Sequence, residues 1–320
     1  MSTKTVLGID ISKKKMDTLL ILNDNPLKKT FDNTSKGHRM LDAWLRSLHV
    51  GQDVHVCLEA TGPYSEPVAE FLYEAGYRVS MVNPKAVHEL GKAQLRRNKT
   101  DTADARLIAD FCLAMEPDAW HPLPPEIKHL QSLTRRIEVL EQIRLSEKNR
   151  LSESAAKEVK PSLKRMIRNL EKEIAEVRKL IKEHITNNPD LKQQSDLLKS
   201  IPGIAEKTAS LLLGELEFSA FASARSMAAH AGLTPRKDQS GSSLNRTRLS
   251  KLGSSRLRKA LYFPAISALQ HNAVIKRFAG RLEANGKKKM EVVCAAMRKL
   301  LHVAFGVIKH QRPFDPNLAF

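Results

Sequence analysis

The sequence contains few cysteines, few aromatic residues and no long hydrophobic run. Cys57, Cys112 and Cys294 are far apart and include no CxxC pair, which excludes a disulfide framework and favours small buried thiols in a reducing compartment. No apolar run approaches the roughly 18 residues of a membrane-spanning helix, and the first residues lack the apolar region of a signal peptide. The sequence therefore predicts a cytoplasmic protein that does not enter a membrane.

Aromatic residues make up only 5% of the 320 residues, whereas the formal net charge is +18. Stacking of bases on aromatic rings is therefore not expected as the main mode of nucleic-acid recognition. The surplus of positive charge favours polyanionic partners that are held through phosphate contacts, with an affinity that falls as salt rises. An ordinary solvated surface can carry the same charge, so the charge does not identify a function by itself.

The first 120 residues predict an α/β domain. Short apolar runs indicate five strands, and the near-continuous apolar character of DVHVCLEA is typical of a strand inside a sheet. The predicted strands are TVLGIDIS, DTLLILND, PLKKTFDN, DVHVCLEA and RVSMVNP, and the predicted helices span residues 35–48, 64–75 and 102–115. Three strands, a helix and then alternating strands and helices is the order of a ribonuclease-H-like sheet.

A Pro-rich linker at 116–124 leads into a helical arm, assigned to residues 121–190. One helix is predicted over 126–157 and would span roughly 48 Å. After the interruption at Pro161, apolar positions alternate steps of four and three, the coiled-coil pattern: Leu163, Ile167, Leu170, Ile174, Val177 and Ile181. One hairpin of this length does not easily bury its own stripe. We therefore expect a homo-oligomer, a dimer or a tetramer, with a hairpin that has no partner as the alternative.

Residues 191–320 predict a mainly α-helical domain. DLLKSIPGIAEKTASLLLGEL indicates a helix, a tight turn and a helix, and it resembles a helix-hairpin-helix element that binds phosphate at a helix N-terminus. Ala205 stands where many such motifs have a second glycine, so packing is the alternative role. Three more helices are predicted in FASARSMAAHAGL, SRLRKALYFPAISALQHN and KMEVVCAAMRKLLHVAFGVIKH, and TPRKDQSGSSLNRTRLSKLGSS predicts a flexible basic segment.

Four carboxylates form the candidate site. Asp10 ends the first predicted strand and Glu59 ends the fourth, while Asp101 and Asp104 lie three residues apart on one face of a predicted helix. Carboxylates brought to one point repel each other unless a cation neutralises them, and Mg²⁺ takes oxygen ligands of this kind. In a basic protein this set predicts a Mg²⁺ site that acts on a nucleic-acid phosphate. Taken singly, each acid has a structural alternative, such as a helix cap at Asp101.

Basic residues accompany these acids and also surround a serine, Ser240. A serine beside a glycine in a loop can approach a phosphate closely, and nearby cations stabilise the charge that develops during phosphoryl transfer. Ser242 and Ser243 are equal candidates on composition alone. The predicted nucleic-acid-binding residues are Arg96, Arg97, Lys99, Arg236, Lys237, Arg246, Arg248, Lys251, Arg256, Arg258 and Lys259.

Several motifs occur together and in order: GIDIS, LEATG, NPK, RRNKTDTADARLIA, IPGI, AGLTPRKDQSG and R-x-R-x-SKLGSSRLRKAL. With them the chain, from about Val6 to His302, resembles bacterial insertion-sequence transposases of the DEDD type. These are also described as bridge-RNA-guided serine recombinases and are related to the Piv DNA invertases. The resemblance implies a RuvC-like N-terminal domain, a coiled-coil arm and a C-terminal transposase domain in a protein of the bacterial cytoplasm.

The same resemblance implies roles for individual residues and partners. Asp10, Glu59, Asp101 and Asp104 would be the Mg²⁺ ligands, and Ser240 would be the nucleophile that joins covalently to DNA. It also implies a structured noncoding RNA that pairs with target and donor DNA. The first alternative is a metal-dependent nuclease or junction resolvase of the same fold that uses water as its nucleophile. The second is a nucleic-acid-binding protein without catalytic activity.

Overall fold

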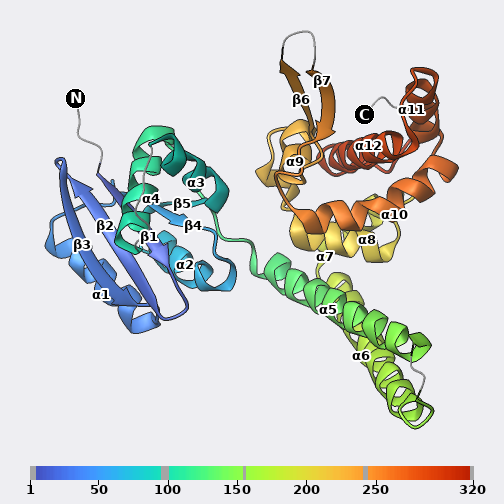
Figure 1. Ribbon diagram of the computed structural model, residues 1–320, viewed down its shortest axis with the longest axis horizontal. Helices are drawn as coiled ribbons and strands as arrows, with labels where there is room; N and C mark the ends of the chain where they lie inside the picture. Colours follow the sequence, from blue (N-terminus) through green and yellow to red (C-terminus); the bar gives the residue numbers. More distant parts are fainter. Residues whose placement is uncertain (1–4, 95–100, 154–155, 241–243, 318–320) are drawn as a thin grey trace. The chain divides into compact units, whose positions relative to one another are not determined.

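A computed structural model of the chain describes residues 5–94, 101–153, 156–240 and 244–317, without the side chains of residues 101–103, 237–240 and 244–246. The chain divides into two compact units, Met1–Pro122 and Leu123–Phe320 (Figure 1). The boundary lies two residues from the predicted one at 120. None of the helices in the described residues is both long and apolar enough to cross a membrane.

The first unit is built on a five-stranded mixed sheet. Its strand order is β3-β2-β1-β4-β5, in which β1, β2 and β3 form an antiparallel meander and β4 and β5 run parallel to β1. The bounds are β1 Val6–Ile11, β2 Lys15–Leu22, β3 Asn25–Asp32, β4 His55–Glu59 and β5 Arg78–Val82. All five strands are where the sequence predicts them, and the sheet is compatible with a RuvC-like fold.

Helices cover both faces of this sheet (Figure 1). Leu41 of α1 and Leu72 of α2 share a buried core with one face, whereas Ala105 and Ile108 of α4 share a core with the other. The bounds are α1 Ser35–Ser47, α2 Glu66–Glu74, α3 Pro84–Ala93 and α4 Asp101–Met115, with a short 3₁₀ turn, η1, at Gly62–Tyr64.

The sequence did not predict helix α3, because Pro84 in RVSMVNP indicates only the end of the preceding strand. Pro84 instead occupies the first turn of the helix, where its missing N–H is not needed. The side chain of Asn83 caps the helix by accepting a hydrogen bond from the N–H of Lys85 at 2.9 Å.

Gly8 is required where α4 crosses β1. A Cβ atom at this position would lie 2.5 Å from the backbone nitrogen of Ala109, closer than real Cβ contacts. We expect Gly8→Ala to lower the free energy of unfolding of the first unit by about 3 kcal/mol, since the helix must shift. Both tryptophans, Trp44 and Trp120, lie in this unit, so their fluorescence during urea unfolding measures it.

The control for this experiment is Gly51→Ala, since a Cβ at Gly51 has no atom within 4 Å and the residue has no positive φ. This variant should unfold at the same urea concentration as the wild type or slightly higher. Equal transitions for the Gly8 and Gly51 variants would show that the helix does not press on β1.

The second unit begins with a helical hairpin of α5, Pro125–Glu153, and α6, Lys160–Asn187 (Figure 1). The two helices are antiparallel, because the ion pairs Arg178–Glu141 and Lys148–Glu171, both at 3.0 Å, run in opposite chain directions. The predicted stripe is buried from Ile167 onward within the chain itself. The structure therefore contains a helical hairpin, while the coiled coil and the homo-oligomer stay predictions.

Six further helices, one short 3₁₀ turn and one pair of strands follow in the described part of this unit. Their core is continuous with that of the hairpin, since Leu130 and Ile137 of α5 belong to the same cluster as Leu212, Leu261 and Leu300. The division predicted at 190 therefore does not separate two cores. The bounds are α7 Pro189–Lys199, α8 Glu206–Glu215, η2 Phe218–Ala220, α9 Ala224–His230, α10 Ser255–His271, α11 Ala273–Ala284 and α12 Lys289–His310.

The predicted flexible basic segment is wrong in part, because two strands form within it. Strands β6, Pro235–Ser240, and β7, Leu244–Leu249, pair antiparallel over six residues. Both strands are mostly polar, so no alternation of apolar and polar residues indicated them in the sequence. The helix α11 was also not predicted; it begins where the Asn272 side chain caps the N–H groups of Val274 and Ile275.

Candidate active site

Asp10 and Glu59 lie at one edge of the sheet and on one face. In the parallel pairing of β1 and β4, Gly8 is opposite Cys57, and each acid comes two residues later. Because side chains alternate between the faces of a strand, the acids share the face of Gly8 and Cys57, which packs on α4. Both acids are half-buried. The predicted adjacency of the first and fourth strands is confirmed.

Helix α4 runs antiparallel to these strands and begins at the same edge. Ala105 packs on Gly8 in the middle of β1. Two turns later, the Sγ atom of Cys112 lies 3.8 Å from the carbonyl oxygen of His55 at the start of β4. The first turn of α4 therefore lies toward the carboxyl ends of both strands, and it contains Asp104. The backbone thus directs the predicted acids to one end of one face.

The acids whose side chains are described do not complete a metal site by themselves. Within those side chains, no group of three histidine, cysteine or carboxylate residues is placed to hold a metal ion. The side chain of Asp101 and all of Arg96, Arg97 and Lys99 lie outside the described residues. The four-acid site and its basic neighbours therefore stay predictions.

The sequence analysis missed a fifth acid, Asp17, beside this site. Asp17 lies directly opposite Asp10 in the antiparallel pairing of β1 and β2. Its carboxylate is 3.0 Å from the Nζ atom of Lys15 and accepts a hydrogen bond of 2.7 Å from the hydroxyl of Thr30. These partners already neutralise Asp17. The strand alternation alone could have placed it next to Asp10.

Thr61 was also missed. Its hydroxyl is buried, two residues after Glu59, and it has no hydrogen-bond partner among the described residues. A buried polar atom without a partner costs about 1–3 kcal/mol. A ligand oxygen or a water held by a cation at this edge would satisfy it, which fits a metal and phosphate site.

The predicted nucleophile Ser240 ends strand β6. Its backbone pairs with Leu244, the last pair at the tip of the hairpin. Ser242 and Ser243, the competing candidates, lie outside the described residues. Further down the hairpin, Arg236 is opposite Arg248, and both are exposed. Like charges directly opposite each other repel, and a bound polyanion would relieve that repulsion.

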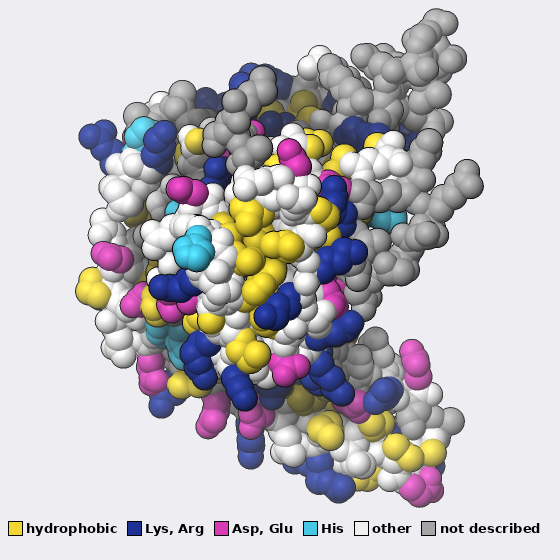
Figure 2. All heavy atoms as spheres, turned by 90° about the vertical axis from the view of Figure 1, so that its left-hand side faces the viewer, with side chains coloured by type: hydrophobic (Ala, Val, Ile, Leu, Met, Phe, Trp, Pro, Cys, Tyr) yellow, Lys and Arg dark blue, Asp and Glu magenta, His cyan; other side chains and the backbone are white. Residues whose placement is uncertain are grey.

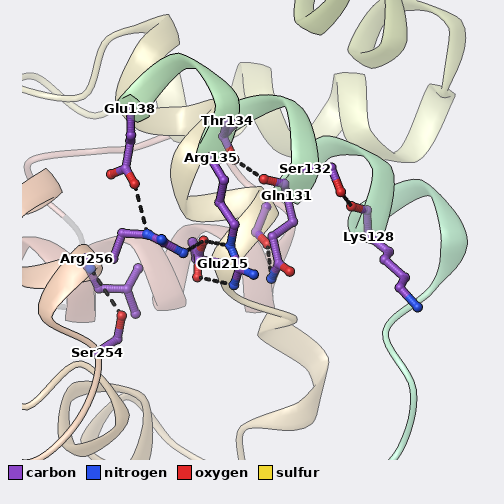
Figure 3. A network of polar contacts seen from close by, with 11 residues as sticks. Lys128, Gln131, Ser132, Thr134, Arg135, Glu138, Glu215, Ser254 and Arg256 are labelled. Carbon is purple, nitrogen blue, oxygen red and sulfur yellow. Dashed lines mark hydrogen bonds and ion pairs between the residues drawn. The ribbon is translucent and has the colours of Figure 1, made fainter. Parts of the chain in front are cut away.

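Arg256 belongs to an ion-pair network inside the second unit (Figure 3). Its guanidinium is 2.8 Å from Glu138 on α5 and 3.3 Å from Glu215 at the end of α8. Arg135 contacts the same Glu215 at 2.8 Å. The network joins α5, α8 and α10. The structure therefore gives Arg256 a structural role, and its contact with nucleic acid stays a prediction.

Arg258 is likewise engaged within the chain. Its guanidinium donates to the carbonyl oxygens of Ala231 at 3.1 Å and Gly253 at 3.0 Å. The remaining predicted basic residues of this unit divide into two groups. Arg236, Arg248, Lys251 and Lys259 are exposed, and the side chains of Lys237 and Arg246 lie outside the described residues.

The turn at IPGI packs against α10. Gly203 has a φ of +106°, and a Cβ there would lie 2.8 Å from the Cβ of Ala268 and 2.9 Å from the carbonyl oxygen of Pro264. Asn272 also donates to the carbonyl oxygen of Pro202 at 3.3 Å. These contacts support the packing role of the turn, and a phosphate contact stays a prediction.

Positive charge is spread over the face of the molecule in Figure 2. On the face in Figure 2, lysine and arginine side chains border a central area of apolar side chains, with acidic side chains between them. The net charge of +18 is therefore not confined to one patch of this face. It favours nucleic-acid binding in general without marking a single site.

Comparisons with known proteins cover nearly the whole chain. Residues 7–159 match a transposase family of the IS110 DEDD type, and residues 195–279 match the transposases of the IS116/IS110/IS902 family. The chain is 33% identical to the pilin gene-inverting proteins of Moraxella bovis and Moraxella lacunata, over 99% of each chain. It is also 26% identical, over 36% of its length, to an uncharacterized IS110 insertion-element protein of Streptomyces coelicolor.

Proposed function

Because the chain belongs to the IS110 family of transposases and DNA invertases, enzymes that cleave and rejoin DNA, we propose that it recombines DNA through a covalent phosphoserine intermediate. One observation supports a metal-dependent cleavage step in this reaction. The sheet pairing and the direction of α4 bring Asp10, Glu59 and Asp104 to one end of one face. Together with Asp101, these acids would form a donor set of four carboxylates for a divalent cation.

Proteins of the DEDD transposase family typically depend on a divalent metal; we propose Mg²⁺ here. Asp10, Glu59, Asp101 and Asp104 would hold it, and when bound it would neutralise charge on the scissile phosphate and lower the pKa of the attacking hydroxyl. Without a cation these carboxylates repel one another, which favours side-chain positions that are apart. The unpartnered hydroxyl of Thr61 would donate to a phosphate oxygen at the same edge.

Ser240 would supply the nucleophile. Its Oγ atom attacks the phosphorus, its proton passes to solvent or a nearby base, and the bond from phosphorus to the leaving sugar oxygen breaks. The leaving oxygen takes up a proton and becomes a free hydroxyl end. The reverse attack by a hydroxyl on the phosphoserine rejoins DNA and regenerates the serine, so no high-energy cofactor is consumed.

The partners would be target and donor DNA together with a structured noncoding RNA that pairs with both. The net charge of +18 supports such a large polyanionic assembly. Strand exchange between inverted sites on one DNA molecule gives inversion, the process named for the Moraxella relatives. Exchange between a circular donor and a target gives insertion. The orientation of the sites, and not a difference in chemistry, would select the outcome.

Removal of divalent metal tests this proposal. The purified protein is mixed with DNA that contains the sequences flanking its gene and with RNA transcribed from them, and products are separated on denaturing gels. We expect a covalent protein–DNA adduct with Mg²⁺, none with EDTA, and recovery when excess Mg²⁺ is added back. Digestion of the RNA beforehand should remove the adduct at the specific site.

Two results would contradict the proposal. Strand cleavage with Mg²⁺ that leaves no adduct would identify the nuclease or resolvase alternative, in which water is the nucleophile. Binding of DNA with no cleavage under any of these conditions would identify a protein without catalytic activity.

A further inference from the structure

Helix α12 contains two buried polar atoms that have no partner. The Nε atom of Arg298 and the Nε2 atom of His302 are inaccessible and make no hydrogen bond within the described residues. The two residues are four apart, so they lie on one face of the helix. Buried polar groups in native proteins are nearly always satisfied. The Nε atom of Arg298 is therefore a donor that a water or a ligand could satisfy.

The surroundings of these atoms are positively charged. Burial lowers the pKa of His302, and the charges of Arg298, Lys299 and Arg225 lower it further. Arg225 is exposed at the start of α9, which packs beside α12 (Figure 1). Neither Arg225 nor Arg298 forms an ion pair with any described residue. Several cations thus converge without an acid that compensates Arg225 or Arg298.

This cluster lies beside the foot of the β6–β7 hairpin. Burial raises the pKa of Cys294, one turn before Arg298 on α12, and the charge of Lys251, two residues after β7, opposes that rise. The backbone N–H of Lys251 also binds the carbonyl oxygen of Gly232, just after α9, at 3.2 Å. Basic side chains therefore continue from α12 and α9 to Lys251 at the foot of the hairpin, and of these Arg225 and Lys251 are exposed.

A phosphate group that is bound through two of its oxygens fits this cluster. Guanidinium groups bind phosphate through two parallel N–H bonds, and a phosphodiester carries the negative charge that the cluster lacks. We propose that Arg298, His302 and Arg225 form a seat for a backbone phosphate of a nucleic-acid duplex, at the foot of the hairpin that carries Ser240. This seat rests on the proposed function, since it would hold the backbone beside the reacting strand.

The test measures binding and not recombination, so its failure is distinct from failure of the serine chemistry. Arg298→Met is compared with Lys192→Met, which removes an exposed charge on α7. The full-length proteins are titrated with one duplex of DNA and one of RNA, of equal length and generic sequence, at several salt concentrations. We expect binding of at least one duplex to weaken about tenfold in the Arg298 variant.

The slope of log affinity against log salt should also become shallower. For the DNA duplex the change should be about 0.9, the value for one phosphate contact, and for the RNA duplex it should likewise correspond to one contact. The Lys192 variant should keep the slope of the wild type. A reduced slope for DNA alone identifies a DNA seat, and a reduced slope for both identifies a general phosphodiester seat. A reduced slope for RNA alone identifies a seat for the guide.

Thermal unfolding separates this proposal from a purely structural role for Arg298. Because Arg298 forms no ion pair with a described residue, Arg298→Met should leave the thermal midpoint unchanged or raise it, whereas a structural role requires a lower midpoint. Arg225→Gln, at an exposed position, provides a second variant that does not disturb the core. An unchanged salt slope for both duplexes in both variants would overturn the proposal.

Discussion

Ser240→Ala is expected to abolish the covalent protein–DNA adduct, with a fall in recombination on the order of 10³-fold or more. The hydroxyl of this serine is the proposed nucleophile, and alanine has no atom that can form an ester with phosphorus. The adduct is measured on denaturing gels with end-labelled DNA, and binding is measured separately in the native state. Binding should change little, because the basic residues around the hairpin remain.

The controls are Ser242→Ala and Ser243→Ala, which remove the two neighbouring hydroxyls and leave Ser240 in place. Each should still form the adduct. Ser240 ends strand β6, so the backbone pairing with Leu244 restrains it. If the Ser240 variant kept its adduct while one of the control variants lost it, the nucleophile would be that other serine.

Asp10→Asn is expected to reduce strand cleavage on the order of 10³-fold, equivalent to about 4 kcal/mol of transition-state stabilisation. The amide has nearly the same shape as the carboxylate but no charge, so it weakens the hold on a divalent cation without altering the packing of β1. Cleavage of a labelled substrate with Mg²⁺ measures the effect. Affinity for DNA and RNA should remain within a few-fold of the wild type.

Asp17→Asn is the matched control, because Asp17 lies directly opposite Asp10 on the neighbouring strand. Lys15 and Thr30 already bind its carboxylate, so the loss of this charge should lower cleavage less than about tenfold. Equal losses in the two variants would indicate that general charge at this edge matters and not a ligand at Asp10. A parallel loss of nucleic-acid binding in Asp10→Asn would indicate a structural role.

Asp10 and Glu59 could be predicted from local pattern because each one ends a strongly apolar run. Strands as hydrophobic as VLGIDI and HVCLE must be buried, and the residue that follows the run comes to the edge of the sheet. The ligand set could not be completed in this way. Whether Asp17 or Asp10 is available as a metal ligand depends on the contacts of Asp17 with Lys15 and Thr30. The contact with Thr30 exists only because β3 pairs with β2.

Local pattern failed at one pair of strands and at two helices. Both strands of the β6–β7 hairpin are polar, so apolar and polar residues do not alternate along them. Helices α3 and α11 begin at Asn caps, where the sequence indicates only the end of the preceding strand or helix. The hairpin of α5 and α6 shows the reverse case. Its heptad pattern predicted the buried stripe correctly, but the partner that covers the stripe is within the same chain.

The sequence by itself determined the periodic elements, the surplus of positive charge and the motifs that identify an IS110-family enzyme, because these depend on residue type and on spacing along the chain. Only the tertiary structure decided that Arg256 is paired with Glu138 and Glu215, and that Arg298 and His302 each bury one nitrogen that has no partner among the described residues. The physical reason is that the role of a charged side chain depends on its neighbours in space. Those neighbours come from helices far apart in the sequence, which meet only when the hydrophobic core forms.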